Sequence, residues 1–127
     1  CEGYATGASL HMATEKPVAV ALDSGNLEPV AKALREKFPQ AQITICADND
    51  HALKRNGKPY NVGMEKAKAA ALAVGGKVAA PVFNEEEKAK GLTDFNDLHK
   101  SRGIKEVQKQ VGLSLLHDQG KTRELSL

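Results

Sequence analysis

The chain has 127 residues and a formal net charge of +2, a small difference between 18 basic and 16 acidic residues. This length suits one compact domain, and the hydrophobic content of 41% excludes a disordered tail. No uninterrupted apolar run approaches the roughly 20 residues that a bilayer requires, so the sequence predicts no membrane span. Because the charges nearly balance, they do not by themselves indicate a nucleic-acid partner.

The two cysteines, Cys1 and Cys46, form neither a disulfide framework nor a CxxC metal motif. Cys46 lies inside an apolar run, which is typical of a buried free thiol. This cysteine usage predicts a reducing, cytoplasmic location. The chain begins with Cys-Glu-Gly rather than Met and has no signal peptide, so we interpret it as a piece of a longer protein.

Helical and strand-like segments alternate along the chain. A short helix is predicted over 5–13, and helices with periodic apolar residues over 27–38, which Ser24 or Asn26 can cap, and over 61–74. A last helix, capped by Ser101, is predicted to carry Ile104, Val107 and Val111. Three apolar runs are predicted strands covered on both faces: 17–22, 42–47 and 77–83.

This alternation predicts an α/β fold with a parallel sheet of about four strands flanked by helices. A further strand is expected to precede Cys1, so the first strand of the domain is expected to be truncated. We assign residues 1–113 to this domain and residues 114–127 to a linker or loose C-terminal segment, because the latter show no clear period.

Acidic residues follow each predicted strand, where the functional crevice of a parallel sheet lies. Carboxylates about 4 Å apart repel by roughly 1 to 4 kcal/mol, and a divalent cation offsets that repulsion. An all-oxygen cluster favours Mg²⁺ or Mn²⁺ and thereby phosphoryl or nucleotidyl transfer. The acids are Glu2, Asp23, Asp48, Asp50, Asp94 and Asp97.

Asp is also a common helix cap, and capping is the favoured interpretation for Asp23. For Asp48 and Asp50 metal binding is favoured, because a turn does not need two acids at i and i+2. Asp97 is expected to cap a short helix, and Asp94 to reach the metal. The basic residues Lys54, Arg55 and Lys58 are candidates for phosphate binding, or ordinary charges of a solvated loop.

The order of three motifs resembles the Toprim domain shared by DnaG-type primases, topoisomerases and some nucleases. The motifs are Glu2-Gly3-Tyr4, Asp48-Asn49-Asp50 and the stretch from Thr93 to Asp97. The resemblance covers about residues 1–111 and is greatest to primases of phages and conjugative plasmids.

The resemblance implies that Asp48, Asp50 and Asp94 bind Mg²⁺ or Mn²⁺, with Glu2 as general base or electrostatic element. It also implies RNA primer synthesis, with single-stranded DNA, nucleoside triphosphates and the other domains of a parent primase as partners. Three further residues are candidates, either as additional metal ligands or as residues that contact the ligands: Asn96, Asp97 and Asp23.

Two neutral residues depart from the family pattern: Thr6 stands where many bacterial primases have an Asp, and Asn96 where some have a second Asp. The isolated domain is therefore expected to have little or no activity. Three alternatives stay open at this point: a Toprim nuclease, a receiver-like module, and a noncatalytic interaction module with an incomplete metal site.

Overall fold

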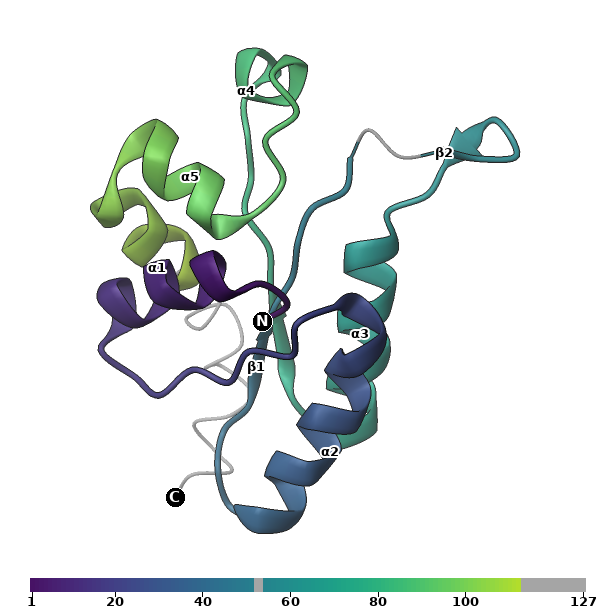
Figure 1. Ribbon diagram of the computed structural model, residues 1–127, viewed down its shortest axis with the longest axis vertical. Helices are drawn as coiled ribbons and strands as arrows, with labels where there is room; N and C mark the ends of the chain where they lie inside the picture. Colours follow the sequence, from purple (N-terminus) through teal and green to yellow (C-terminus); the bar gives the residue numbers. More distant parts are fainter. Residues whose placement is uncertain (52–53, 113–127) are drawn as a thin grey trace.

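The computed structural model describes residues 1–51 and 54–112, with residues 54–55 and 58–59 described by their backbone only. A two-stranded parallel sheet lies at its centre, formed by β1 (Thr44–Cys46) and β4 (Lys77–Ala79). Helices cover both faces of this sheet, as Figure 1 shows. The α/β fold class expected from the sequence is confirmed.

The strands send alternate side chains into two separate cores, as the period of two along a β-strand requires. Cys46 and Ala79 face one core, whereas Ile45 and Ala47 face the other. Because both faces are apolar, the sheet must be covered on both sides. The burial of the free Cys46 thiol raises its pKa to about 11, in keeping with its predicted place in the core.

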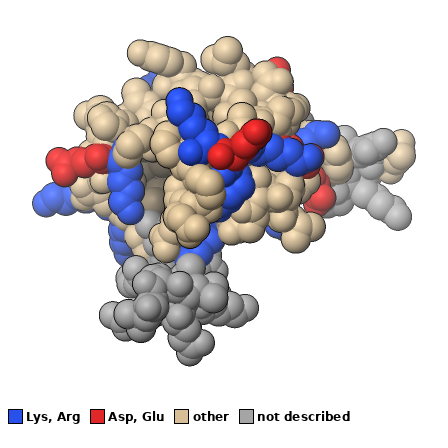
Figure 2. Space-filling model, turned by 90° about the horizontal axis from the view of Figure 1, so that it is seen from below, with Lys and Arg blue, Asp and Glu red and all other residues tan. Residues whose placement is uncertain are grey.

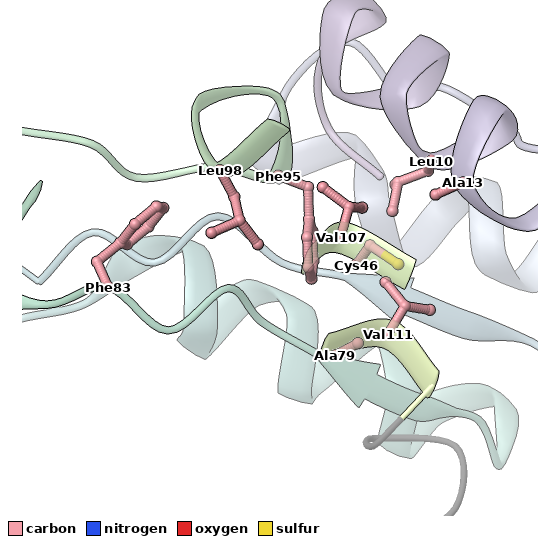
Figure 3. Packing of buried hydrophobic residues seen from close by; sticks show 9 residues of the cluster. All are labelled: Leu10, Ala13, Cys46, Ala79, Phe83, Phe95, Leu98, Val107 and Val111. Atoms are coloured by element: carbon pink, nitrogen blue, oxygen red, sulfur yellow. The ribbon is translucent and has the colours of Figure 1, made fainter. Parts of the chain in front are cut away.

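One face of the sheet is covered by α2 (Leu27–Lys37) and α3 (Val62–Val74), which pack against each other. The small residues Ala67 and Ala70 of α3 are fully buried in this core. The other face is covered by α1 (Tyr4–Thr14), α5 (Phe95–Arg102) and a helix over 104–112. Figure 3 shows that Phe95 and Leu98 of α5 lie in this second core with Leu10 of α1.

The ends of the helices follow local side-chain chemistry. The side chain of Asn61 accepts a hydrogen bond from the amide of Met64 at the start of α3, and Gly75 ends that helix in the left-handed conformation. Before α2, the Asp23 side chain caps the short 3₁₀ helix η1 (Ser24–Asn26). The Asn26 side chain makes no cap bond to α2, so the predicted capping role of Asn26 is wrong.

The C-terminal helices differ from the sequence prediction. Ser101 lies inside α5 and is not a cap, and Gly103 separates α5 from the helix over 104–112. A short helix that the sequence analysis missed, α4 (Glu85–Ala89), begins with a reciprocal capping box. The buried Glu87 of α4 accepts hydrogen bonds from Arg102 and Ser101, and these interactions lower its pKa to about 2.

The predicted strand over 17–22 does not form a regular strand. The amides of Ala21 and Leu22 donate to the carbonyls of Cys1 and Glu2, at 2.9 and 2.8 Å, but Leu22 has a φ of 80°, which breaks the extended conformation. In the described part of the chain, the parallel sheet therefore has two strands instead of about four.

The basic segment forms a small antiparallel hairpin of β2 (Lys54–Arg55) and β3 (Lys58–Pro59). Its turn residues, Asn56 and Gly57, both have positive φ, as the tight turn of a two-residue hairpin requires. The hairpin projects away from the body of the domain (Figure 1).

At the opposite end of the molecule, near α2, basic and acidic side chains are intermixed on the surface (Figure 2). Of the helices in the described residues, none combines the length and the apolar character that a membrane span demands. The predicted terminal segment over 114–127 lies outside the described residues.

Candidate metal centre

Asp48 stands where the parallel sheet ends. The amide of Ala47 donates to the carbonyl of Ala79 at 2.7 Å, which extends the β1–β4 ladder to the residue before Asp48. Asp48 is thereby fixed at the carboxyl edge of the sheet, where ligands bind in open α/β folds.

The environment of Asp48 opposes its negative charge. Burial raises the pKa of Asp48 to about 8, with further contributions from Glu2, which also hydrogen-bonds to it, and from Asp94 and Asp50. Its Oδ1 atom is buried without a hydrogen-bond partner. Such an atom is costly unless a proton or a cation compensates it. Asp48 is thus the centre of a group of four acids.

Asp50 is oriented by the start of α3. Its Oδ2 atom accepts a hydrogen bond from the amide of Gly63 at 2.7 Å, and its own amide donates to Oδ1 of Asn61 at 2.8 Å. The positive end of the helix dipole stabilises a carboxylate in this position. A Cβ on Gly63 would collide with Oδ2 of Asp50 and with the carbonyl of Asp48, so only glycine fits there.

Asn49, the middle residue of the acidic motif, joins three neighbouring segments. Its amide donates to the carbonyl of Thr93 at 2.7 Å, its Nδ2 donates to the carbonyl of Pro81 at 2.9 Å, and its Oδ1 accepts from Nδ2 of Asn61 at 2.7 Å. The sequence analysis treated Asn49 as a spacer. No periodic signal could reveal these partners, because they are distant in sequence.

Asp94 is the N-cap of α5. Its Oδ1 accepts from the amide of Asp97 at 2.7 Å, and Oδ2 of Asp97 accepts from the amides of Asp94 and Thr93. The expectation that Asp97 rather than Asp94 caps the helix is therefore wrong: the two residues form a capping box together. Burial raises the pKa of Asp94, while hydrogen bonds from the Asp97 amide and the Thr6 side chain lower it.

Glu2 lies two residues before the start of α1, far from Asp48 in the sequence, and its side chain contacts that of Asp48. Its carbonyl accepts from the amide of Leu22 at 2.8 Å, and its carboxyl hydrogen-bonds to the carboxyl of Asp48. Two carboxyl groups in contact repel each other when both are charged, and a cation between them offsets this repulsion. The structure therefore brings Glu2, Asp48, Asp50 and Asp94 together, from three separate segments of the chain.

The remaining candidates make other contacts. Oδ1 of Asn96 accepts from the Ser9 hydroxyl at 3.2 Å, and Asp23 caps η1 and does not contribute to the pKa shift of Asp48. The three basic candidates have their backbone on the β2–β3 hairpin: Lys54, Arg55 and Lys58.

The donor chemistry of the four acids fits a hard divalent cation. All four supply carboxylate oxygens, and the orphaned Oδ1 of Asp48 is an acceptor that a cation would satisfy. No group of three or more His, Cys, Asp or Glu side chains is already arranged around a common point, as far as residues 1–51 and 54–112 are concerned. A cation would have to draw these carboxylates closer together.

We expect the stability of the metal-free domain to fall as the pH rises from about 5 to about 8. At pH values between 3.8, the ordinary pKa of Asp, and about 8, Asp48 is deprotonated in the unfolded chain but still protonated in the folded domain. Because the folded state binds more protons, its free energy of unfolding decreases with pH. Urea unfolding in the presence of a chelator measures this slope. Asp48→Asn should flatten it, and an unchanged slope in that variant would contradict our assignment.

Comparison with known proteins places the chain in a class. Residues 1–105 match the Toprim domain family, and the chain belongs to that family. Two Escherichia coli proteins named DNA primase TraC are similar to it, with 49% identity over 87 residues and 43% over 88 residues. These matches cover 68% and 69% of the chain, but 6% and 8% of the relatives.

The chain thus spans less than a tenth of the length of these curated relatives. No solved structure matches it closely. The resemblance to Toprim domains of plasmid primases, which rested on three short motifs, is confirmed.

Proposed function

We propose that the chain is the metal-dependent nucleotidyl-transfer domain of a plasmid or phage DNA primase. In this proposal it synthesises RNA primers on single-stranded DNA in the cytoplasm, together with other domains of a longer parent protein. The observation that carries the proposal is the partnerless, buried Oδ1 of Asp48 among three further acids. The similarity to DNA primases supports the type of reaction.

Asp48, Asp50 and Asp94 would hold Mg²⁺ or Mn²⁺. One oxygen of each carboxylate is already hydrogen-bonded, Oδ2 of Asp50 to the Gly63 amide and Oδ1 of Asp94 to the Asp97 amide, and a cation would draw the carboxylates closer together. Asp97 then acts through Asp94 rather than as a ligand, because its Oδ2 accepts from two amides. When bound, the metal would neutralise phosphate charge and lower the pKa of the attacking 3′-hydroxyl.

Glu2 is suited to accept the proton of that hydroxyl. Its carboxyl lies next to that of Asp48, one of the proposed metal ligands. The hydroxyl oxygen forms a bond to the α-phosphorus of a nucleoside triphosphate, the bond to the β-phosphate breaks, and pyrophosphate leaves. The projecting hairpin that carries Lys54, Arg55 and Lys58 would contact nucleotide or template phosphates.

The test is primer synthesis by the longer protein that carries this domain. We expect Asp48→Asn combined with Asp50→Asn to reduce the rate by roughly 10²-fold or more, because ligand removal forfeits several kcal/mol of transition-state stabilisation. The matched control replaces two acids of α2 away from the site, Glu28→Gln with Glu36→Gln, and should keep its activity. Wild-type priming by the Asp48/Asp50 variant would overturn the proposal.

A noncatalytic interaction module is the second candidate. It is favoured by the neutral residues Thr6 and Asn96 and by the absence, among the described residues, of three acids already gathered around one point. In that case the double Asn variant should retain single-stranded DNA binding and lose nothing in a priming assay, because another domain would supply the chemistry.

A further inference from the structure

Two neutral amide side chains lie among the candidate acids: Asn49, the middle residue of the acidic motif, and Asn61, the N-cap of α3. Nδ2 of Asn61 donates to Oδ1 of Asn49 at 2.7 Å. The two residues are 12 positions apart in the chain, so this hydrogen bond is a tertiary contact. It ties the loop after β1 to the start of α3.

The partners of the two side chains fix the role of every amide atom. Oδ1 of Asn61 accepts from the backbone amides of Asp50 and Met64, at 2.8 and 3.2 Å, and an amide N–H can only donate. Nδ2 of Asn61 must therefore face Asn49, which presents its oxygen in return. Nδ2 of Asn49 then donates to the carbonyl of Pro81 at 2.9 Å. The hydrogen bonds form one continuous chain in which each donor and acceptor has a fixed partner.

This chain of hydrogen bonds connects the segments that carry two candidate ligands. At one end it holds the backbone amide of Asp50, whose Oδ2 accepts from Gly63 in the first turn of α3. Near the other end, the backbone amide of Asn49 donates to the carbonyl of Thr93 at 2.7 Å, and Thr93 directly precedes Asp94. The loop that carries Asp50 is therefore joined to the segment that carries Asp94.

We propose that Asn49 and Asn61 are positioning residues of the metal centre: their hydrogen bond holds the loop over 48–50 against α3 and against the segment over 93–94, so that acids of both segments reach one divalent cation. This inference rests on the proposed function. Segments that are already held lose less conformational entropy when a cation draws their carboxylates together. Replacing a residue that supports metal ligands by hydrogen bonds typically changes metal affinity by 10- to 100-fold.

The test compares Mn²⁺ binding by Asn61→Ser and Asn84→Ser, measured by electron paramagnetic resonance of the free ion. Each variant replaces an N-cap asparagine by serine, which is also a good cap, so both helices should keep their starts. The side chain of Asn84 accepts only from Glu87 of its own helix among the printed contacts of the site-distant α4, whereas Asn61 loses its amide group and with it the bond to Asn49. We expect about a tenfold loss of Mn²⁺ affinity in Asn61→Ser and none in Asn84→Ser.

Two further measurements distinguish positioning from a merely structural role. In chelator, hydrogen exchange of the Asn49 backbone amide should accelerate in Asn61→Ser, because the loop is held less firmly against Thr93, and stay unchanged in Asn84→Ser. Asn49→Ala should weaken Mn²⁺ binding about as much as Asn61→Ser. The variant that combines these two changes should lose clearly less than the sum of both, because each change removes the same hydrogen bond.

Unchanged Mn²⁺ affinity in Asn61→Ser, or an equal loss in Asn84→Ser, would overturn the inference and leave the metal centre intact. Unchanged exchange of the Asn49 amide, or additive losses in the combined variant, would overturn it as well. If Asn61→Ser does not fold, Asn49→Ala provides the comparison with the N-cap of α3 left in place. Failure of the wild-type domain to bind Mn²⁺ would overturn both this inference and the proposed function.

Discussion

Gly63→Ala is expected to weaken divalent-metal binding by at least tenfold and to destabilise the domain. A Cβ at this position would lie 2.8 Å from Oδ2 of Asp50 and closer still to the carbonyl oxygen of Asp48. Because one of these atoms belongs to the backbone, the whole Asp48–Asp50 segment must move away from α3. Overpacking of this kind typically costs 1 to 3 kcal/mol, more than the roughly 1 kcal/mol that Ala gains over Gly in a helix.

Mn²⁺ titration and urea unfolding of this variant measure the two effects. Gly112→Ala is the matched control, because it makes the same change at a helical glycine where an added Cβ meets nothing within 4 Å. That control should retain wild-type Mn²⁺ affinity and be at least as stable as the wild type, by up to about 1 kcal/mol. Normal Mn²⁺ affinity in Gly63→Ala would show that the hydrogen bond between Gly63 and Asp50 does not orient a ligand.

Phe95→Ala is expected to lower the free energy of unfolding by about 3 to 5 kcal/mol, the usual cost of emptying a buried phenylalanine site. Phe95 is fully buried, and it packs with Leu10, Leu98 and Val107 in the core between the sheet and α1 (Figure 3). Small domains have stabilities of about 5 to 15 kcal/mol, so this single change removes a large fraction of the total.

Phe95 also directly follows Asp94, so its packing fixes the start of α5 and with it a candidate ligand. Chemical denaturation measures the loss of stability, and Phe38→Ala is the control. The Phe38 side chain is 50% exposed, and its removal should change stability by at most about 0.5 kcal/mol. A similar small effect for Phe95→Ala would mean that the α1–α5 layer does not contribute to the cooperative core.

The sequence predicts the acids of the site because their signal is local. Asp48 and Asp50 follow a short, mostly apolar run, and such a run in an α/β pattern ends at the carboxyl edge of a sheet. The helices α2 and α3 were predictable for the same reason, since their apolar periodicity, Asn61 and Gly75 lie within a few residues. The match to the Toprim domain family confirms the fold that these patterns indicated.

The errors arose where a residue has two possible partners. Asp94 and Asp97 can each cap a helix, and the sequence does not show that Asp94 occupies the N-cap while Asp97 returns a hydrogen bond. The same D-x-x-D spacing, compared with the capping-box pattern, would have revealed this arrangement. The related signal N-x-x-E at Asn84 and Glu87 marks α4, which was missed.

Other features depend on tertiary contacts that no local pattern encodes. The apolar run over 17–22 reads as a strand, yet Leu22 takes a positive φ. The run hydrogen-bonds to Cys1, to Glu2 and to the side chain of Asn26. Thr6 appears in the sequence only as a departure from the family pattern. Its effect on the pKa of Asp94 depends on the packing of α1 against α5.

The central claim is that the acids around Asp48 form one metal site, and amide NMR of the ¹⁵N-labelled domain during Mg²⁺ and Mn²⁺ titration tests it most directly. Our account predicts shifts with Mg²⁺ and paramagnetic broadening with Mn²⁺ centred on Asp48, Asp50 and Asp94, both lost when Asp48 and Asp50 are replaced by Asn. If these amides show no response at millimolar metal, or respond equally in the Asn variant, the claim is contradicted.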